Sequence, residues 1–409
     1  MNIWIVNQYS MPPSHPGITR HYEFAQQLIK RGHSVKLICQ DYLHSSKKRP
    51  IDLSGQPYLE QDIDGVDFMW VHVNEYSGNG VGRVVNMAQF AKRVLRHAGK
   101  FSGDAPDIII GSSPSPFAAN AARKLAKKYK VPFVLEVRDL WPQTFIDLGE
   151  MSKWHPFILL LKHLEKKLYR GANAIISVLP NSIEYIANIR GSSSNIHFIP
   201  NGCTLADRPW EEPTKNNSTF KICYAGSMGL SNSLDTLIDA AIIIKQRGNA
   251  SNIRIALCGQ GTHKSELVKK CLLAELGFIE FIDPLPKSAI HSFLVTADAF
   301  VVTMKETPLY QYGISFNKIF DYLAMGRPIV TATCATKDPV VESGAGFAVK
   351  AEDPGQLADA LEDIAKLSIE KRKELGRRGR DWVLRNNSFA SLSDRLEEAL
   401  ESANCLSCK

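Results

Sequence analysis

Short apolar runs that suit β-strands alternate with amphipathic stretches that suit helices along nearly the whole chain. This alternation is typical of parallel sheets covered by helices on both faces. In the first half the expected strands are residues 3–6, 34–39, 66–73, 107–111, 133–137, 174–178 and 197–199. The expected helices there include residues 21–31, 83–97, 116–129 and 156–169. Residues 1–200 are therefore predicted to form one doubly wound, Rossmann-like domain.

The alternation breaks in the polar, proline-bearing residues 201–218, which are interpreted as a linker. It restarts with expected strands at residues 221–225, 254–258, 278–282, 299–303, 328–331 and 347–349. Residues 219–384 are thus predicted to form a second Rossmann-like domain, and a C-terminal helix within residues 385–409 to pack back on the first. Because open parallel sheets bind ligands beyond the carboxyl ends of their strands, we expect an α/β protein whose two domains face each other across a cleft.

The composition is that of an ordinary globular protein, with 409 residues of which 44% are hydrophobic and 22% charged. A chain of this length exceeds one comfortable hydrophobic core, which again favours two domains. The longest apolar runs, residues 157–161 and 240–244, fall far below the roughly 20 residues of a membrane-spanning helix. Residues 1–10 lack the basic and apolar segments of a secretory signal, so a cytoplasmic protein is expected.

The formal net charge of +7 lies in the first half of the chain. Residues 1–200 carry 24 Lys and Arg against 16 Asp and Glu, whereas residues 201–409 carry 25 against 26. A basic half suggests a surface facing anionic lipid or an anionic substrate. Residues 83–100 and 153–170 mix apolar and cationic side chains as interfacial helices do, although core helices with solvated lysines would give the same pattern.

Metal and covalent chemistry are poorly supported. The eight cysteines are scattered, most within apolar segments, which indicates reduced, buried thiols. Cys405 and Cys408 have C-x-x-C spacing, but no second pair completes four ligands, so an inert tail is the simpler interpretation. Asp62 and Asp64 flank a turn-forming Asp-Gly, and no G-x-S-x-G motif occurs. We therefore expect no metal and no cofactor.

Two loops of the first domain carry candidate chemistry. In the loop before the first helix, the backbone at Gly17 can approach a phosphate or sugar, although a plain proline-rich turn is the alternative. Glu136, Arg138, Asp139 and Trp141 stand at the carboxyl end of an apolar strand. Charges there can orient a substrate and the indole offers a flat wall for a sugar, while an Arg–Asp ion pair beside a core tryptophan is the alternative.

Three loops of the second domain are candidates as well. Residues 225–229 and 258–262 follow strands, and their glycines permit close backbone approach to a ligand. A helix beginning near Asn317 carries Lys318 and Asp321 three residues apart, on one face. A routine surface contact is the alternative. At a helix N-terminus, however, Lys318 suits a diphosphate, and Asp321 suits ribose hydroxyls.

With these residues in hand, the chain resembles glycosyltransferase family 4, of the GT-B type, over nearly its full length. The landmarks are the Gly17 loop and residues 136–142 (EVRDLWP), 199–202 (IPNG), 224–226 (YAG), 259–261 (GQG) and 317–328 (NKIFDYLAMGRP). The chain looks most like the WbuB-like branch of bacterial surface-polysaccharide transferases, which implies N-acetyl-L-fucosamine or another N-acetylated hexosamine as the transferred sugar.

The resemblance implies a metal-independent, configuration-retaining transfer from a UDP-sugar, with the donor on the second domain and the acceptor on the first. Candidate donor-binding residues are Gly17, Ser227, Gly259, Gly261, Gly313, Ile314, Ser315, Asn317, Lys318 and Asp321. Glu136 and Trp141 are acceptor-binding candidates, and Arg138, Asp139 and Lys318 are catalytic candidates.

The chain departs from the family pattern at several of these positions. Of two glutamates that the family often carries, the second falls on Asp321 and the first on Gly313, so backbone groups of residues 313–315 would have to contact the donor. The usual arginine and lysine of the first loop are replaced by Ser227 and Asn232, and a usual histidine by Arg138. The positive charge then rests on Lys318 and Arg138, which predicts electrostatic stabilisation of the departing diphosphate with same-face attack by the acceptor.

The resemblance thus implies a hexosyl or N-acetylhexosaminyl transferase of O-antigen, capsule or exopolysaccharide synthesis. Its partners would be a nucleotide-sugar donor, a lipid-linked saccharide acceptor and an anionic membrane surface, with no nucleic acid. It would be cytoplasmic, or peripheral on the inner face of the plasma membrane. Two alternatives stay open, namely a nucleotide-sugar epimerase or hydrolase on the same fold, and a non-catalytic nucleotide-sugar binder.

Overall fold

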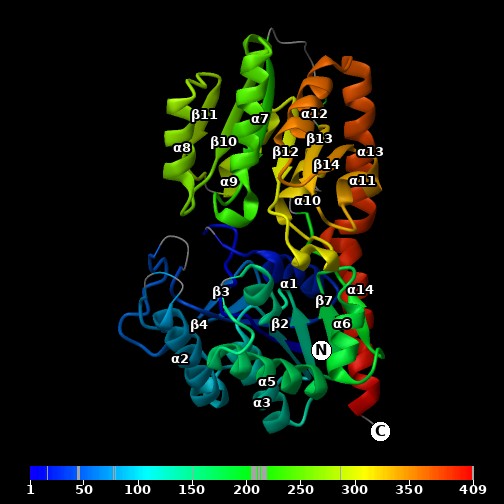
Figure 1. The fold of residues 1–409 in the computed structure, drawn as a ribbon. Coiled ribbons are helices and arrows are strands. Elements are labelled where there is room, and N and C mark those ends of the chain that lie inside the picture. The colour runs from blue at the N-terminus through cyan, green and yellow to red at the C-terminus, as the bar shows by residue number, and fades with distance from the viewer. Residues whose placement is uncertain are drawn as a thin grey trace. The chain divides into compact units, whose positions relative to one another are not determined.

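The strands of the protein, seen here in a computed structural model, gather into two separate sheets (Figure 1). The chain divides into two units, one formed by Met1–Pro200 with Phe389–Lys409 and the other by Asn201–Ser388. The structure describes residues 1–407 apart from residues 16, 44–46, 77, 79, 150, 204–209, 211, 213–218 and 286. Most of the predicted linker, and Cys408, therefore lie outside the described residues.

The first sheet has eight strands in the order β3-β4-β2-β1-β5-β6-β7-β8. Their bounds are β1 Asn2–Val6, β2 Ser34–Gln40, β3 Tyr58–Ile63, β4 Val66–Val71, β5 Ile108–Ser112, β6 Phe133–Val137, β7 Ala174–Ser177 and β8 Ile196–Phe198. All neighbours are parallel except β3 and β4, which are antiparallel. The central strands are almost wholly buried and apolar because helices cover both of their faces.

Strand β3 is absent from the sequence prediction. Its residues, YLEQDI, are half exposed and half polar, so they lack the apolar run that marks the other strands. The turn after it is the one that the sequence indicates. Asp64 and Gly65 have φ angles of 54° and 81°, and the Gly65 N–H donates to Asp62 Oδ1 at 3.1 Å. Turn chemistry therefore accounts for both aspartates.

Helices of the first unit fall into two layers. Their bounds are α1 Arg20–Lys30, α2 Val81–His97, α3 Pro116–Tyr129, α4 Gln143–Asp147, α5 Pro156–Gly171, α6 Ile183–Arg190 and α14 Phe389–Ser407. Ile3 and Ile5 share a core with apolar residues of α1 and α14. Trp4, between them, instead packs on Tyr129 at the end of α3. Since neighbouring side chains of a strand point to opposite faces, α1 and α14 cover one face of the sheet and α3 the other.

The second sheet has six parallel strands in the order β11-β10-β9-β12-β13-β14. They are β9 Phe220–Ala225, β10 Ile253–Cys258, β11 Ile279–Ile282, β12 Ala299–Thr303, β13 Ile329–Thr333 and β14 Gly346–Lys350. The α-helices are α7 Leu234–Gln246, α8 Lys264–Leu273, α9 Lys287–Val295, α10 Asn317–Met325, α11 Pro339–Ser343, α12 Pro354–Lys366 and α13 Ile369–Asn387. The order reverses between β9 and β12, and a doubly wound sheet binds its ligands outside the carboxyl ends of such a pair.

The second unit extends beyond the predicted residues 219–384 at both ends. Its first residue, Asn201, donates its backbone N–H to Ser315 Oγ at 2.9 Å. The amide of Asn387, at the end of α13, donates to the Asn201 carbonyl at 2.9 Å. These buried bonds between segments far apart in sequence fasten Asn201 and the end of α13 to this unit. The helix after them, α14, packs on α1 and β7 of the first unit.

None of the described helices is long and apolar enough to cross a membrane. All seven cysteines within the described residues are free thiols, and five of them are buried, namely Cys39, Cys203, Cys223, Cys258 and Cys271. Burial of these five thiols agrees with the apolar segments in which the sequence places most of the cysteines.

Candidate active site

Lys318, the second residue of α10, places a cation at the carboxyl end of β9. Its ammonium donates to Tyr224 Oη at 2.9 Å and to Asn232 Oδ1 at 2.6 Å, and lies 4.5 Å from the centroid of the Tyr224 ring. The side chain is partly buried, and burial lowers its pKa to about 7. Within the described chain no carboxylate lies within 4.0 Å of this ammonium. A partly buried cation without a counter-ion favours an anionic ligand.

The neighbours of Lys318 are set by the turns that follow β9. Gly226 is the first residue after the strand, and a Cβ there would lie 3.2 Å from Lys318 Cε and Nζ. Glycine thus leaves the room that the ammonium occupies. Asn232 ends a short 3₁₀ helix, Leu230–Asn232, whose last carbonyl accepts a 2.5 Å hydrogen bond from Thr303 Oγ1 at the end of β12. The two strands at the reversal point therefore hold the Lys318 site together.

The start of α10 adds backbone donors to the same place. Phe316 occupies the N-cap position and no side chain caps the helix, so its first N–H groups have no side-chain acceptor. The helix dipole is positive at this end. Lys318 and the N-terminus of α10 thus bring a cation and backbone N–H donors together, a combination that is suited to phosphate oxygens.

Gly259 and Gly261 serve first to stack two loops on each other. A Cβ on Gly259, where φ is 152°, would lie 1.9 Å from the Gly226 carbonyl oxygen. A Cβ on Gly261 would lie 2.3 Å from the Met228 carbonyl oxygen. The Met228 N–H donates to the Gln260 carbonyl at 2.9 Å, which locks the pair. The Ser227 carbonyl accepts from Tyr224 Oη at 2.5 Å. Loop packing alone thus requires these glycines, whether or not they also contact a donor.

The charged groups of Asp321 and Lys318 contact different side chains. The Asp321 carboxylate accepts a hydrogen bond from the Cys203 thiol at 3.7 Å, whereas the Lys318 ammonium contacts Tyr224 and Asn232. No ion pair within 4.0 Å joins the two residues, so a routine surface pair is not formed either. One helix turn separates them in sequence, but their charged atoms contact different elements.

The residues before α10 are used partly by the fold itself. Ser315 accepts the Asn201 N–H on its hydroxyl and the Asn201 amide on its carbonyl, at 2.9 and 2.5 Å. Its side chain therefore fastens the start of the second unit. Ile314 is buried in the apolar core, and Asn317 is exposed. Gly313 has φ 84° and ψ −178°, a conformation that only glycine adopts readily. A glutamate at this position would be strained in this conformation.

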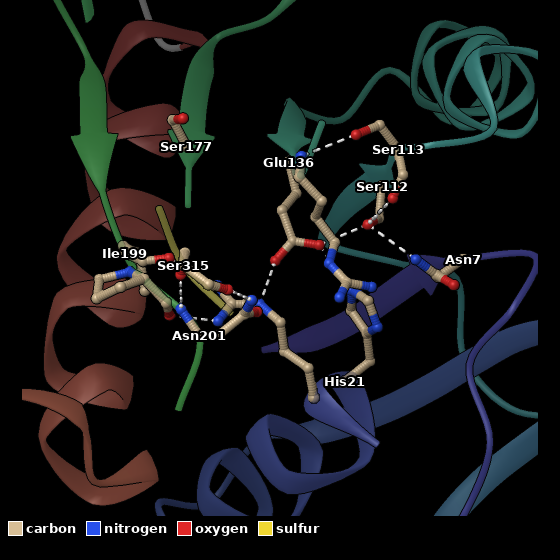
Figure 2. Close-up of polar contacts among 12 residues, drawn as sticks. Asn7, His21, Ser112, Ser113, Glu136, Ser177, Ile199, Asn201 and Ser315 are labelled. Atoms are coloured by element: carbon tan, nitrogen blue, oxygen red, sulfur yellow. Dashed lines mark hydrogen bonds and ion pairs between the residues drawn. The ribbon is translucent and has the colours of Figure 1, made fainter. Parts of the chain in front are cut away.

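At the carboxyl end of β6 in the first unit, Glu136 is the centre of a buried network (Figure 2). Arg20 Nε donates to Glu136 Oε1 at 2.8 Å, and His21 Nε2 lies 2.7 Å from Oε2. The Ser112 hydroxyl also donates to Oε2, and Asn7 Nδ2 donates to Ser112 Oγ at 2.8 Å. The other guanidinium nitrogens of Arg20 donate to the carbonyls of residues 199 and 200. Glu136 therefore ties four segments of the unit together.

This network corrects the acceptor-binding role expected for Glu136. The residue is 4% exposed, and Arg20, His21 and Ser112 occupy its carboxylate oxygens. Burial alone would raise the pKa of Glu136, but the charges of His21 and Arg20 hold it well below its ordinary value. Burial lowers the pKa of His21. Glu136 thus acts inside the unit as an organising anion, and its buried carboxylate already binds three side chains of this unit.

Arg138 has the opposite character, since two of its guanidinium nitrogens have no hydrogen-bond partner within the described chain. Its backbone N–H donates to Ser113 Oγ at 2.8 Å, which fixes the main chain. Its Nε and Nη1 atoms are buried and have no hydrogen-bond partner within the described chain. Burial lowers the pKa of this guanidinium to about 10, although it stays charged at pH 7. Unsatisfied donors at the carboxyl edge of the sheet are suited to an anionic or hydroxylated ligand.

Asp139 is occupied by its own neighbours. It accepts from Trp141 Nε1 at 3.0 Å and from Thr144 Oγ1 at 2.5 Å, and burial raises its pKa. Trp141 packs against Phe145, and the guanidinium of Arg83 lies 5.5 Å from its ring. The alternative interpretation of these residues is an ion pair between Arg138 and Asp139. No such pair within 4.0 Å occurs in the described chain. Asp139 therefore orients Trp141. Its contacts favour a positioning role for Asp139 over a catalytic role.

Gly17 lies in a loop that closes on itself. The Met11 N–H donates to the Ile18 carbonyl at 2.9 Å, and Gly17 has a φ of 156°. A Cβ at this position would lie 2.8 Å from Met11 Cγ. The glycine is exposed at the turn before α1, where the sequence predicts it.

For metals, the described residues contain no group of three or more His, Cys, Asp or Glu able to hold an ion.

Comparison with known proteins decides the family. The Glycosyl transferase 4-like domain matches residues 17–202, and the Glycosyl transferases group 1 domain matches residues 219–366. The chain belongs to glycosyltransferase family 4. It is 23% identical over 360 residues to the colanic acid biosynthesis glycosyl transferase WcaI of Escherichia coli K12, covering 81% of this chain and 83% of that one. It is 19% identical over 335 residues to the glycosyltransferase WbjE of Pseudomonas aeruginosa, covering 76% and 79%.

The solved structures similar to this glycosyltransferase have the GT-B fold. Sucrose-phosphate synthase from Thermosynechococcus elongatus aligns with a TM-score of 0.74 at 14% identity over 97% of both chains. HepE of Anabaena, solved in complex with UDP, aligns with a TM-score of 0.69 at 14% identity over 98% of this chain and 100% of that one. The predicted GT-B class is therefore confirmed.

Several site residues of this family 4 glycosyltransferase escape the sequence analysis. Tyr224 and Asn232 orient Lys318, and Arg20 and His21 surround Glu136. The position of Asn232 is noticed only as a replacement for a lysine. Its Oδ1 could have been paired with Lys318 only by knowing that the loop after β9 meets the start of α10.

Proposed function

We propose that this glycosyltransferase moves a sugar from a UDP-sugar to a lipid-linked saccharide, with retention of configuration and without a metal ion. The observation that carries the proposal is the ammonium of Lys318, which lies beside the uncapped start of α10 and has no carboxylate within 4.0 Å in the described chain. Two similar structures, both of HepE of Anabaena, hold UDP and UDP-glucose, which supports the choice of donor.

In the proposed reaction the bond between the sugar C1 and the diphosphate oxygen breaks while the acceptor hydroxyl oxygen bonds to C1. The leaving diphosphate gains negative charge as this bond breaks. Lys318 and the N–H groups of α10 would stabilise that charge, an effect worth a factor of about 10² in rate for one well-placed donor. The proton of the acceptor hydroxyl passes to the diphosphate on the same face of the sugar. Positive charge from the protein would thus take the place that a divalent cation holds in other transferases.

On the first unit, the acceptor would meet the carboxyl edge of the sheet. Trp141 supplies a flat ring whose position is set by Asp139, and Arg138 supplies unsatisfied donors. Stacking on an indole and hydrogen bonding to a guanidinium are both suited to a saccharide. We propose Arg138 and Trp141 as the principal acceptor-side residues, and Asp139 as the residue that positions the indole.

We also propose which sugar is transferred and in which pathway the enzyme acts. The relatives WcaI and WbjE are named as glycosyltransferases, and the name of the first places it in colanic acid biosynthesis. These names support a role in making a bacterial surface polysaccharide such as O-antigen, capsule or exopolysaccharide. We propose an N-acetylated hexosamine, for example N-acetyl-L-fucosamine, as the transferred sugar, and the cytoplasmic face of the membrane as the place of reaction.

The test is a transfer assay. The full chain is incubated with radiolabelled UDP-sugars and a bacterial lipid extract, and label is counted in the organic phase. We expect one UDP-N-acetylhexosamine to label the lipid fraction, with EDTA causing no loss. Lys318→Ala should lower the rate about 10²-fold. The matched control is Lys270→Ala, because Lys270 lies on α8 and pairs with Asp239 at 2.8 Å, outside the site.

Incubation with donor alone separates the two rival functions. Release or epimerisation of the sugar at the full rate without any lipid would replace the transferase by a hydrolase or an epimerase. Tight binding of a UDP-sugar with no turnover under either condition would identify a non-catalytic binder. Equal transfer by wild type and Lys318→Ala would remove the phosphate role of Lys318.

A further inference from the structure

Three helices of the first unit carry half of the 24 Lys and Arg residues in residues 1–200 and almost no acidic residues. Helices α2, α3 and α5 hold four Lys or Arg residues each, twelve in all. Their single carboxylate is Glu165 on α5, which is buried and accepts a hydrogen bond from Tyr185 at 2.9 Å. Burial raises the pKa of Glu165 to about 7, so it carries only part of a charge at neutral pH. These helices pack side by side along one face of the sheet (Figure 1).

The opposite face of the same sheet has the opposite balance. Helices α1 and α14, which share the core of Ile3 and Ile5, carry three Lys or Arg residues against five Asp or Glu. The excess of positive charge in the first half of the sequence is therefore not spread over the unit. It is concentrated on the face formed by α2, α3 and α5, here called the basic face.

Most of the cations on the basic face are exposed and have no carboxylate beside them. Nine of the twelve are exposed, namely Lys92, Arg96, Lys124, Lys127, Lys128, Lys162, Lys166, Lys167 and Arg170. None of the nine has a carboxylate within 4.0 Å among the described residues, whereas exposed lysines elsewhere, such as Lys366 and Lys371, do. A surface of unpaired cations attracts a polyanion and repels a like surface.

Large apolar side chains accompany these cations near one end of the face. Trp154, just before α5, is 74% exposed, and Leu159 and Leu160 in its first turns are 48% and 46% exposed. On α2, Val81 and Val85 are 78% and 56% exposed. Each of these helices follows a strand of the parallel sheet, so its first turns lie toward the carboxyl edge, where the candidate acceptor residues are.

The basic face is linked directly to the candidate acceptor site. Arg83, on the first turn of α2, places its guanidinium 5.5 Å from the ring of Trp141 and 5.8 Å from the ring of Tyr9. The apolar start of α2 is thus in contact with the residues at the ends of β1 and β6. A surface that touches the basic face would lie next to the acceptor site.

We propose that the basic face docks on an anionic lipid bilayer, with Trp154, Leu159 and Leu160 inserted among the headgroups and the lysines of α3 and α5 on the lipid phosphates. The inference deepens the proposed function and rests on it for the acceptor, since it names the surface on which a lipid-linked saccharide would be met. Cations along helix flanks with apolar side chains beside them are the arrangement of interfacial helices.

A nucleic acid is the other polyanion that such charge could attract. The exposed aliphatic side chains argue against it, because Leu159, Leu160, Val81 and Val85 offer neither hydrogen bonds nor flat rings to a nucleic acid. Lipid acyl chains, in contrast, solvate aliphatic groups directly. The chemistry of the apolar end therefore favours a bilayer.

The test is co-sedimentation of the full chain with vesicles of phosphatidylcholine alone or with about 30 mol % phosphatidylglycerol, at low and high salt. We expect binding only to the anionic vesicles, weakened by salt. The triple variant Lys124→Glu, Lys127→Glu, Lys166→Glu should lower the partition coefficient more than 10²-fold, since each cation contributes about fivefold. Trp154→Ser with Leu159→Ser should lower binding at both salt concentrations, because it removes the apolar contribution, which salt does not screen.

The matched control reverses three exposed lysines of the second unit, Lys269, Lys350 and Lys366, to glutamate, which changes the net charge equally. It should bind vesicles as wild type does. Thermal shift with UDP, measured on every variant, checks folding and donor binding separately from docking. Loss of binding in the control as well as in the basic-face variant would overturn the proposal, because net charge alone would then explain vesicle binding.

Two further outcomes would also overturn it. In the first, wild-type protein does not bind anionic vesicles but transfers sugar to a detergent-solubilised lipid acceptor. This outcome would be consistent with the proposed function. The other is duplex DNA competing fully with vesicles while the Trp154→Ser, Leu159→Ser variant binds vesicles normally. Conversely, vesicle binding that depends on the basic face, in a protein without transferase activity, would support docking while the proposed function failed.

Discussion

Lys318 donates a 2.6 Å hydrogen bond to the side-chain oxygen of Asn232, which lies 86 residues earlier in the chain. Because the acceptor is neutral, it holds the ammonium in place without cancelling its charge. Tyr224 does the same from the other side at 2.9 Å. A rigidly held cation with neutral partners keeps its full attraction for a ligand phosphate.

Replacing Asn232 by aspartate should therefore weaken donor binding. The new carboxylate would pair with Lys318 and compete with the diphosphate, so we expect the Kd for UDP to rise at least tenfold in isothermal titration. The matched control is Asn252→Asp, which adds the same charge just before β10, at the opposite edge of the sheet. Unchanged affinity of Asn232→Asp would mean that the diphosphate does not meet Lys318.

Donor binding should weaken as the pH rises above 7. Burial lowers the pKa of Lys318 to about 7 in the free protein, and a bound diphosphate would raise it again because it stabilises the charged form. Binding then takes up a proton above pH 7, so the Kd for UDP-glucose should rise by up to about tenfold per pH unit. Below pH 7 the ammonium is already formed and the Kd should level off.

The control for this pH profile is Lys318→Arg, since a guanidinium stays charged over the whole range. Its Kd should be flat from pH 6 to 9, whatever its absolute value. UDP-glucose is the right probe because its diphosphate diester does not titrate in this range. A wild-type profile as flat as that of the arginine variant would contradict a site built on the Lys318 ammonium.

Restoring the family glutamate at position 313 should harm the protein. Gly313 has φ 84° and ψ −178°, a region where a side chain costs about 1–3 kcal/mol. We expect Gly313→Glu to lower the free energy of unfolding by that amount in a denaturant titration, with no gain in transfer rate. Gly277→Glu is the control, because that glycine lacks a positive φ and a Cβ there would meet nothing within 4 Å. A more active Gly313→Glu enzyme would show that the loop can accept the family geometry.

Glu136→Gln should destabilise the first unit and change its response to acid. Removing one partner of a buried ion pair costs about 3–5 kcal/mol, because Arg20 keeps a buried charge. The pKa of Glu136 is held well below its ordinary value, so the wild-type carboxylate stabilises the fold above about pH 4.5, and this contribution is lost as the pH falls toward the folded pKa. The variant should lack that acid-dependent part.

Thermal unfolding from pH 3 to 8 measures this effect. Glu398→Gln, at an exposed position of α14, serves as the control and should follow the wild-type curve. A Glu136→Gln protein as stable as wild type at pH 7 would mean that the Arg20 and His21 contacts contribute little.

Much of the fold is predictable from the sequence because its buried strands are local apolar runs. Strand β6 and helix α3 fall on the expected residues 133–137 and 116–129, since their flanking turns carry clear signals. Strand β3 is missed because a half-exposed edge strand needs no apolar run. The pattern of apolar and polar residues thus predicts the buried strands and the helices, but not a half-exposed edge strand.

The direction of the polar side chains is not predictable in this way. Glu136 has the sequence position of a ligand-binding residue, yet Arg20 and His21, 116 and 115 residues away, take up its carboxylate. Lys318 and Asp321 lie three residues apart, yet Asn232 and Cys203 attract their charged atoms to different places. Such partners come from distant segments, and only the assembled sheet brings them together.

A crystal structure of the full chain with UDP would show directly whether Lys318 binds the donor diphosphate. We expect the diphosphate oxygens to lie within hydrogen-bonding distance, about 3 Å, of Lys318 Nζ and of N–H groups at the start of α10. UDP bound elsewhere on the protein, or bound with its diphosphate away from Lys318, would contradict this expectation.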